Sequence, residues 1–473
     1  MRQTDAGLQW RLVNLQAKIE ELQTAEDHMM SQLDEVRRRK NDLRSEYAEL
    51  ANSTAAIACL PDEVLTEIFR HLDGGWDAKL PFLVNASQVI RRWRTVALST
   101  PTLWSKIELR PTSRSGLYQT DLIKEYLSRS SAGLLDIYIY MGEQQDTAPV
   151  EKLLIPQISR WKRFVVESAG ELAVQVFVRS LRDLSAPCLE HLQIDLEIDD
   201  EQYEWLWRGE GHTLGGGAPA MYCLETRGIN MQRWLPPLGA VKSLYMADCY
   251  SATLLNHSQF REMLTALTSL THLELEGMIN CGPSDDVTPI EMPSLLSLCV
   301  LPPDFVNPVH YVRNIFTTIS APALQTLCLK KVHGQQFRVF LETFRGVACH
   351  PTLTTLTLES VTGLEYLTPA FIRSSPTITH LCLKSISDPT PILKLLASHN
   401  YDSMWPRLKT LTVGPVDNSL LRSLISDRIS AGRPLAKLRY ATQSRATFDS
   451  IPANEMTWFA ERLRVENISY HDM

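Results

Sequence analysis

The sequence has little cysteine and no excess of basic charge. Its 473 residues include 9 cysteines, and no two of them form a Cys-x-x-Cys pair. Scattered cysteines without such pairs are typical of a reducing compartment, so we expect a cytoplasmic or nuclear protein, or one present in both. The 47 basic and 54 acidic residues give a net charge of −7. Nucleic-acid-binding domains usually carry a basic excess, so we expect no nucleic-acid partner.

Long hydrophobic runs and catalytic motifs are also missing. No stretch approaches the roughly 18 uninterrupted apolar residues of a membrane span, so we expect no membrane partner. The chain contains no Gly-x-Ser-x-Gly, His-Glu-x-x-His, Gly-x-Gly-x-x-Gly or phosphate-binding Gly-Lys-Ser/Thr motif. No histidine is spaced from the cysteines as in common zinc sites. We therefore expect no catalytic residues, no metal and no cofactor, and an enzyme is the least favoured hypothesis.

Leucine is abundant instead, and its first cluster repeats at alternating steps of three and four from Leu8 to Leu50. Eleven of the thirteen positions in this series are apolar, and no glycine or proline interrupts it. The pattern predicts a coiled-coil helix over residues 8–52. Two positions of the seam are charged, Glu26 and Lys40. They would weaken a parallel homodimer, or they would pair across an antiparallel or heteromeric partner. The alternative is a single helix that lies on its own protein.

A short helical module is predicted next. Its first helix begins at Pro61, a residue that the first turn of a helix tolerates, and two acidic residues follow near the helix N-terminus. The apolar residues of this helix recur at helical spacing and form one broad face. A second helical stretch, roughly Leu80 to Leu98, ends at a Ser-Thr-Pro sequence, and a strand-like segment follows.

Together these segments resemble an F-box. The motif reads Leu60-Pro61-x-Glu63-Val64-Leu65-x-x-Ile68-Phe69-x-x-Leu72, then Val89-x-Arg91-Arg92-Trp93-Arg94, then Pro101-x-Leu103-Trp104. With a heptad helix before it, the motif is most similar to fungal (basidiomycete-type) F-box-like proteins. One departure is Ile90, which stands where many members carry cysteine.

The resemblance implies an interaction role for residues 57–110. In this family the F-box is a three-helix module that docks on the Skp adaptor of a cullin-based (SCF) ubiquitin ligase. Carried over by position, eight residues would form or support the adaptor contact: Leu60, Pro61, Val64, Leu65, Ile68, Phe69, Leu72 and Trp93. The residues alone indicate only that this apolar face is too large to leave in water. The alternative is that the face packs on the segment that follows.

The rest of the chain repeats one pattern, Pro-x-Leu-x-x-Leu-x-Leu or a close variant of it. Twelve copies begin between Leu134 and Leu435 at a mean spacing of about 27 residues, which lies in the range of leucine-rich repeats. Each copy should give one short parallel strand, and amphipathic stretches such as 254–267, 309–319 and 335–344 should give returning helices. Neither element buries its apolar face alone, so neighbouring units stack.

These patterns predict an α/β chain in three parts. A coiled-coil helix at 8–52 and a three-helix F-box at 57–110 precede a curved leucine-rich-repeat solenoid with a parallel sheet and a C-terminal cap at 111–473. Many leucine-rich repeats place Asn or Cys after the strand to satisfy the carbonyl groups of the turn. This chain mostly has apolar residues there, so its turns must close in another way.

The side chains that alternate with the strand leucines should line the concave face of the sheet. The candidate target-binding residues on this face are Tyr245, His272, Glu274, Glu276, Lys330, Thr357, Glu359, His380 and Lys384. They are polar and of mixed charge, which suits a protein or peptide ligand, whereas a nucleic acid would require a basic stripe.

Two functional hypotheses follow. The leading one is a substrate-recognition subunit of an SCF-type ubiquitin ligase, in which the F-box binds the Skp adaptor of the cullin scaffold and the repeats bind an unknown protein substrate. The alternative is a coiled-coil and leucine-rich-repeat interaction scaffold whose F-box no longer docks on a ligase. In both, self-association through the coiled coil is an option.

Overall fold

A computed structural model of the chain describes residues 3–72, 82–110, 120–142, 146–196, 213–229, 234–248, 255–277, 288–303, 308–346, 351–397, 405–414, 416–442 and 453–469. The chain divides into two compact units, Met1–Trp104 and Ser105–Met473. The division falls inside the segment 57–110 that the sequence assigns to one module. Among the described residues, no helix combines the length and the hydropathy needed to cross a membrane.

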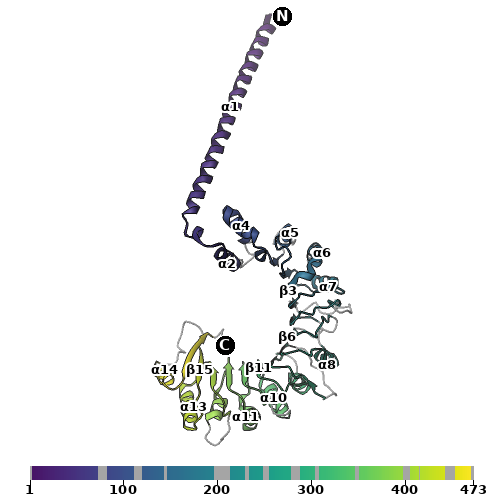
Figure 1. Ribbon diagram of the computed structural model, residues 1–473, viewed down its shortest axis with the longest axis vertical. Coiled ribbons are helices and arrows are strands. Elements are labelled where there is room, and N and C mark those ends of the chain that lie inside the picture. The colour runs from purple at the N-terminus through teal and green to yellow at the C-terminus, as the bar shows by residue number, and fades with distance from the viewer. Residues whose placement is uncertain are drawn as a thin grey trace. The chain divides into compact units, whose positions relative to one another are not determined.

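The first unit begins with one uninterrupted helix, α1 (Gln3–Ser53) (Figure 1). Its 51 residues make it about 76 Å long at 1.5 Å per residue. The helix predicted over 8–52 is therefore confirmed. This segment is helical because leucine, glutamate, glutamine and arginine favour helix and no helix-breaking residue interrupts them. The described side chains from Gly7 to Leu50 are all exposed. Coiled-coil pairing of α1 stays a prediction.

A module of short helices completes the first unit. It consists of η1 (Ala56–Cys59), α2 (Asp62–Leu72), α3 (Phe82–Val89), α4 (Arg91–Ser99) and η2 (Pro101–Trp104). The sequence predicted a single helical stretch over roughly 80–98, and this prediction was wrong in one respect. The chain is extended at Ile90, with φ −141° and ψ 159°. This break separates α3 from α4, so the two helices pack against each other and both contact α2.

In the described part of the second unit, fourteen parallel strands form one sheet, and neighbouring strands follow chain order. The strands are β1 (Lys106–Leu109), β2 (Leu135–Met141), β3 (Trp161–Ser168), β4 (His191–Leu196), β5 (Cys223–Arg227), β6 (Ser243–Asp248), β7 (His272–Gly277), β9 (Ser297–Leu301), β11 (Thr326–Lys330), β12 (Thr355–Glu359), β13 (His380–Lys384), β14 (Thr410–Val413), β15 (Lys437–Thr442) and β16 (Arg464–Ser469). The twelve segments of the sequence repeat correspond to β2 to β7, β9 and β11 to β15. The strand-like segment after the helical module is β1, and β16 had no signal in the repeat.

Helices connect most of these strands. They are α5 (Thr120–Arg129), α6 (Ala148–Leu154), α7 (Glu171–Ser180), α8 (His257–Ala266), α9 (Pro308–Thr318), α10 (Gly334–Gly346), α11 (Pro369–Ser374), α12 (Thr390–Ala397), α13 (Asn418–Ser430) and α14 (Ala453–Ala460), with 3-10 turns η3 (Ile155–Arg160) and η5 (Leu364–Tyr366). The short strands β8 (Ile290–Glu291) and β10 (Ile319–Ser320) form a separate pair. Within this unit the helices lie along the outer side of the curved sheet, and its strands line the inner side (Figure 1).

The core lies between the sheet and these helices. The strand leucines are partners across the sheet, as in the row Leu327, Leu356 and Leu381, and each of these three is at most 1% exposed. The residues between them alternate to the inner side of the sheet, which no described helix covers. Burying each leucine contributes roughly 1.5–3 kcal/mol, so the repeat positions dominate the stability of this unit.

Residues in the left-handed region close the turns after several strands. Gly228, Lys331 and Ser360 follow β5, β11 and β12 with φ of 66°, 49° and 52°. The N–H of each donates to the carbonyl of the last or nearly last residue of the next strand, as from Ser360 to Lys384 at 2.8 Å. These backbone bonds satisfy carbonyl groups at or near the ends of the strands.

Candidate functional site

The eight residues predicted to contact an adaptor divide into two groups by burial. Leu65 and Phe69 are 0% exposed and form the core between α2, α3 and α4. The Phe69 ring makes edge contacts with Trp93 at 5.4 Å and with Phe82 at 5.9 Å between ring centres. These side chains therefore hold the module together rather than offer a surface.

The other group leaves an apolar surface on and beside α2. Val64 is 42% exposed and Leu72 is 53% exposed, and Pro61 at the start of the helix is also exposed. Leu60, Ile68 and Trp93 are half-buried. Helical spacing places Val64, Ile68 and Leu72 on one side of α2, so the exposed apolar atoms form one continuous strip.

Arg92 fixes the segment that enters α2, a role that the sequence did not indicate. Its Nε donates to Asp62 Oδ1 at 2.9 Å, and its terminal nitrogens donate to Asp62 and to the carbonyls of Ala58 and Leu60. One guanidinium thus connects α4 to the carbonyls of Ala58 and Leu60 and to Asp62 at the start of α2. The only sequence signal was a basic pair beside Trp93, and it does not say which partner the arginine has.

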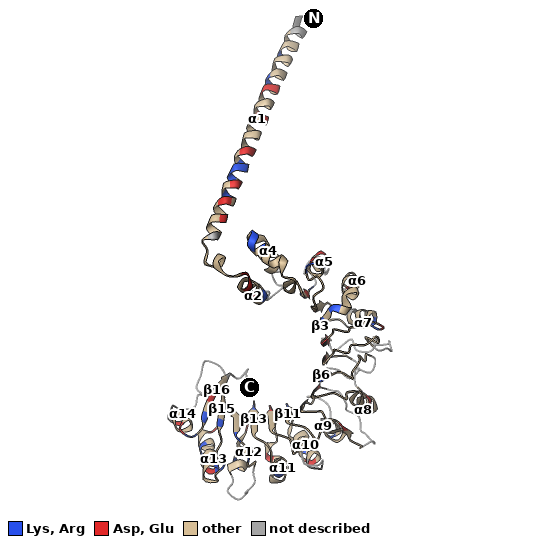
Figure 2. Ribbon diagram, viewed as in Figure 1, with Lys and Arg blue, Asp and Glu red and all other residues tan. Residues whose placement is uncertain are grey.

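The second unit places all nine predicted target-binding residues on the inner side of the sheet. They lie on β6, β7, β11, β12 and β13, between leucines that face the helices. The two exposed histidines each contact the threonine before them: His272 Nδ1 lies 2.8 Å from Thr271 Oγ1, and His380 Nδ1 lies 2.7 Å from Thr379 Oγ1. Both acidic and basic residues lie on the described strands of the sheet, and Figure 2 shows both colours within this unit.

Tyr245 is at the centre of one polar network. Its hydroxyl donates to Glu276 and accepts a hydrogen bond from Arg227, and Arg227 lies 3.6 Å from the Glu276 carboxylate. Burial, followed by the hydrogen bond to Glu276, raises the pKa of Tyr245 above its ordinary value of 10. The predicted residues did not include Arg227. It lies on β5, while its partners Tyr245 and Glu276 lie on β6 and β7, and only the folded sheet brings them together.

Two ion pairs connect the remaining charged residues across strands. Lys330 Nζ lies 2.6 Å from Glu274 Oε1, and Lys384 Nζ lies 3.2 Å from Glu359 Oε1. Burial alone would lower the pKa of Lys330, but the hydrogen bond to Glu274 and the neighbouring negative charges together outweigh it and raise that pKa. Most of the predicted charges are thus paired inside the sheet, and a ligand must replace these contacts or bind the pairs as they stand.

A pocket of about 480 Å³ opens on the inner side of the sheet between β4 and β9. It is lined by Gln193, Asp195, Glu225, Arg227, Ser243, Leu244, Tyr245, His272, Leu273, Glu274, Ser297 and Cys299. Three of the predicted residues, Tyr245, His272 and Glu274, meet in it. The predicted residues on β11, β12 and β13 do not line this pocket.

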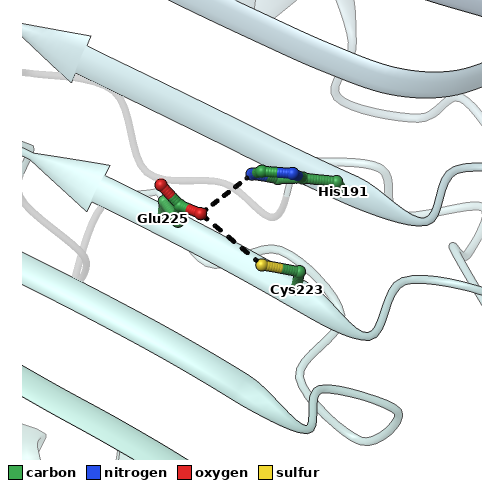
Figure 3. A group of neighbouring side chains, drawn as sticks. All are labelled: His191, Cys223 and Glu225. Carbon is green, nitrogen blue, oxygen red and sulfur yellow. Dashed lines mark hydrogen bonds and ion pairs between the residues drawn. The ribbon is translucent and has the colours of Figure 1, made fainter. Parts of the chain in front are cut away.

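Next to this pocket, His191, Cys223 and Glu225 have ligand atoms within 4.8 Å of one another (Figure 3). Glu225 Oε1 lies 3.2 Å from His191 Nε2 and 3.7 Å from Cys223 Sγ. The imidazole contact lowers the pKa of Glu225 below its ordinary 4.5. Burial and the adjacent carboxylate raise the pKa of the Cys223 thiol to about 11.

These residues are of the types that bind zinc, but their charges favour a hydrogen-bonded network. Zinc binds the thiolate, so an ion there would have to displace the proton of a thiol whose pKa is raised by burial and by Glu225. The Arg163 guanidinium also acts on both Cys223 and Glu225, and a second cation there is unfavourable. We therefore interpret the trio as a network that orients side chains of β4 and β5.

Comparison with known proteins identifies one part of the chain. No curated protein matches the sequence. A family model does match residues 57–110, a range that includes α2, α3, α4 and the whole of β1. By this match, residues 57–110 form an F-box-like domain.

Proposed function

We propose that the chain is a substrate-recognition subunit of an SCF-type ubiquitin ligase and has no catalytic activity of its own. The observation that carries this proposal is the F-box-like match at residues 57–110, together with the apolar strip on α2. The F-box would bind the Skp adaptor, and the adaptor would bind the cullin scaffold. Such a subunit would act in the cytoplasm, the nucleus or both.

The exposed residues of α2 are the proposed adaptor contact. Val64 and Leu72 project from the module, and their burial against a partner would contribute roughly 1.5–3 kcal/mol each. Leu65, Phe69 and Trp93 would act indirectly by fixing the helices. Arg92 would set the position of Leu60 and Pro61 at the edge of the contact.

The second unit is the proposed target-binding part. We infer that its repeated strands and helices form a leucine-rich-repeat solenoid, because the strand leucines recur about every 27 residues and pair in register across the sheet. The polar inner side would bind a protein substrate, and the pocket beside Tyr245 offers a recessed surface for it. Tethering a substrate near the ubiquitin donor raises its effective concentration, so no bond chemistry is required of this chain.

The long N-terminal helix extends the proposal. The heptad stripe of α1 is proposed to form a coiled coil and to bring two copies of the chain together. Such a helix before an F-box and repeats is similar to the arrangement in fungal F-box-like proteins, and we assign the chain to that group by this similarity.

The test is the binding of purified full-length chain to a purified Skp-family adaptor, measured by calorimetry. The wild type should bind, and the double variant Val64→Asp/Leu72→Asp should lose at least 100-fold in affinity because two buried aliphatic contacts become buried charges. The matched control is Ile429→Asp on α13, since Ile429 and Val64 are both 42% exposed. This control should bind like the wild type.

Failure of the wild type to bind would contradict the ligase proposal. The chain would then be better described as an interaction scaffold whose F-box-like domain does not dock. Equal binding by wild type and double variant would show that α2 is not the contact. Circular dichroism of each variant checks that the helices of the module remain folded.

A further inference from the structure

The apolar stripe of α1 is not covered by any described residue of its own chain. All described side chains between Gly7 and Leu50 are exposed, and the exposed fraction of Leu22 is 65% and that of Leu33 is 47%. A stripe that persists over six heptads is much longer than the exposed apolar patches of ordinary monomers. It requires a partner helix of similar length.

Two series of residues form the seam of this stripe. The a series is Leu12, Ile19, Glu26, Leu33, Lys40 and Tyr47, and the d series is Leu8, Leu15, Leu22, Met29, Val36, Leu43 and Leu50. Only two of the thirteen residues are charged, and they carry opposite signs. Acidic and basic residues both occur along the second half of the helix (Figure 2).

A parallel pair of α1 helices would bring like charges together. Each Glu26 would face the same residue of its partner across the seam, and each Lys40 would do likewise. Arg39, which precedes an a position, would face the partner's Arg44, which follows a d position. None of these contacts pairs opposite charges, so parallel self-pairing is disfavoured at two layers of the seam and at one pair of residues that flank it.

We propose that α1 pairs with the α1 of a second copy of this chain in antiparallel orientation. In the proposed register, two residues that lie at the same height along the helix pair, one from each copy, have residue numbers that add to 62. Leu12 is then level with the partner's Leu50, and Met29 with the partner's Leu33. Each seam position from Leu12 to Leu50 meets a seam position of the other helix. This proposal rests on the proposed self-association of α1 and is independent of adaptor binding.

The charges agree with this register. Glu26 lies one layer, or about 6 Å along the axis, from the partner's Lys40, so the two buried charges can pair. Lys18 and Glu46 each precede an a position, and in an antiparallel pair such residues of the two helices lie on the same side. Lys18 is about 3 Å along the axis from the level of the partner's Glu46, so these two charges can also pair. The neighbouring registers are worse. A shift by one heptad in one direction leaves Leu12 and Leu15 without partners, and a shift in the other direction places the partner's Lys40 eleven residues from the level of Glu26.

The antiparallel arrangement has a consequence for the whole assembly. The F-box-like domain follows the C-terminal end of α1, so two copies would carry their domains at opposite ends of the paired helices. Levels 12 and 50 are about 57 Å apart. One dimer would thus present two adaptor-binding modules that face different scaffolds.

The test uses wild-type full-length chain, half of it labelled with ¹⁵N, treated with a carbodiimide that joins carboxylates to amines without a spacer. Mass spectrometry should find mixed-isotope peptides that join Glu26 to Lys40 and Lys18 to Glu46. Within one helix these pairs are about 21 Å and 42 Å apart, so a zero-length link between them must join antiparallel chains. Sedimentation should give twice the 53.6 kDa mass of one chain.

Two outcomes would overturn the proposal. Mixed-isotope links between residues of nearly equal number would mean parallel pairing and would leave self-association intact. A monomer with links inside single chains only would contradict self-association itself, and neither outcome bears on adaptor binding. Leu33→Asp should reduce the mass to that of one chain. The matched control Ser31→Asp, which lies on the outer face of the same turn, should leave the dimer unchanged.

Discussion

The two units of the chain use leucine in opposite ways. In the second unit the repeated leucines are buried between the sheet and its helices, as Leu356 is at 1% exposure. In the first unit the heptad leucines of α1 are exposed to solvent, as Leu22 is with 65% exposure, and so are Val64 and Leu72 of α2. A leucine repeat therefore predicts an apolar face, but burial decides whether that face is a core or a surface for a partner.

The difference also separates self-sufficient from dependent structure. Each strand of the second unit pairs with its neighbours through backbone hydrogen bonds and a row of leucines. The helix α1 has its own backbone bonds and a few exposed side-chain pairs, such as Arg37 with Asp34 and Arg91 of α4 with Glu49. No row of buried leucines supports its described residues, and an isolated helix is marginal in water. We expect the second unit to be stable alone and α1 to depend on a partner.

The largest expected effect is on the buried row. Leu356→Ala should lower the free energy of unfolding of the second unit by about 2–5 kcal/mol, because the change leaves a cavity that the rigid sheet does not fill. Leu22→Ala on α1 should leave the unfolding of the second unit unchanged. Urea denaturation followed by tryptophan fluorescence measures both, and equal effects of the two variants would contradict the comparison.

A smaller effect is expected at the turns of the sheet. Gly228 has φ 66°, and a Cβ there would lie 2.5 Å from the carbonyl oxygen of Leu196. Gly228→Ala should therefore cost about 1–3 kcal/mol. Ser360 has a similar φ of 52°, so Ser360→Gly should be neutral or stabilise the unit by up to about 1 kcal/mol. The same urea series measures both variants, and a harmless Gly228→Ala would refute the role of left-handed turns.

The smallest effect concerns pH. The folded state lowers the pKa of Glu225 below 4.5, so the contribution of this group to stability is present above that pH and is lost as pH falls through the lowered pKa. Glu225→Gln should be less stable than wild type at pH 6, and the difference should shrink below about pH 4. Thermal unfolding at several pH values measures it, and a difference that grows on acidification would have the wrong sign.

Much of the fold could be predicted from the sequence, because periodicity reports directly on backbone geometry. Steps of three and four gave α1, and the spacing of Leu327 and Leu356 gave neighbouring strands in the correct register. The extended residue Ile90 and the strand β16 were missed. No glycine or proline marks the break at Ile90, and β16 does not continue the leucine pattern of the other strands.

The candidate sites were harder to predict, because they depend on which side chains meet. Spacing could not distinguish Leu65, which is buried, from Val64, which is exposed, since both belong to the broad apolar face of α2. Arg92, Arg227 and His191 make contacts with residues at least 18 positions away, and only the folded chain brings these partners together.

The most direct test of the account is assembly with the ligase scaffold. Sedimentation velocity on a mixture of the chain, a Skp-family adaptor and the adaptor-binding half of a cullin should show one complex that contains all three. When the adaptor is left out, or when the chain carries Val64→Asp/Leu72→Asp, the cullin should sediment apart from the chain. A chain that sediments apart from adaptor and cullin in the complete mixture would contradict the central claim.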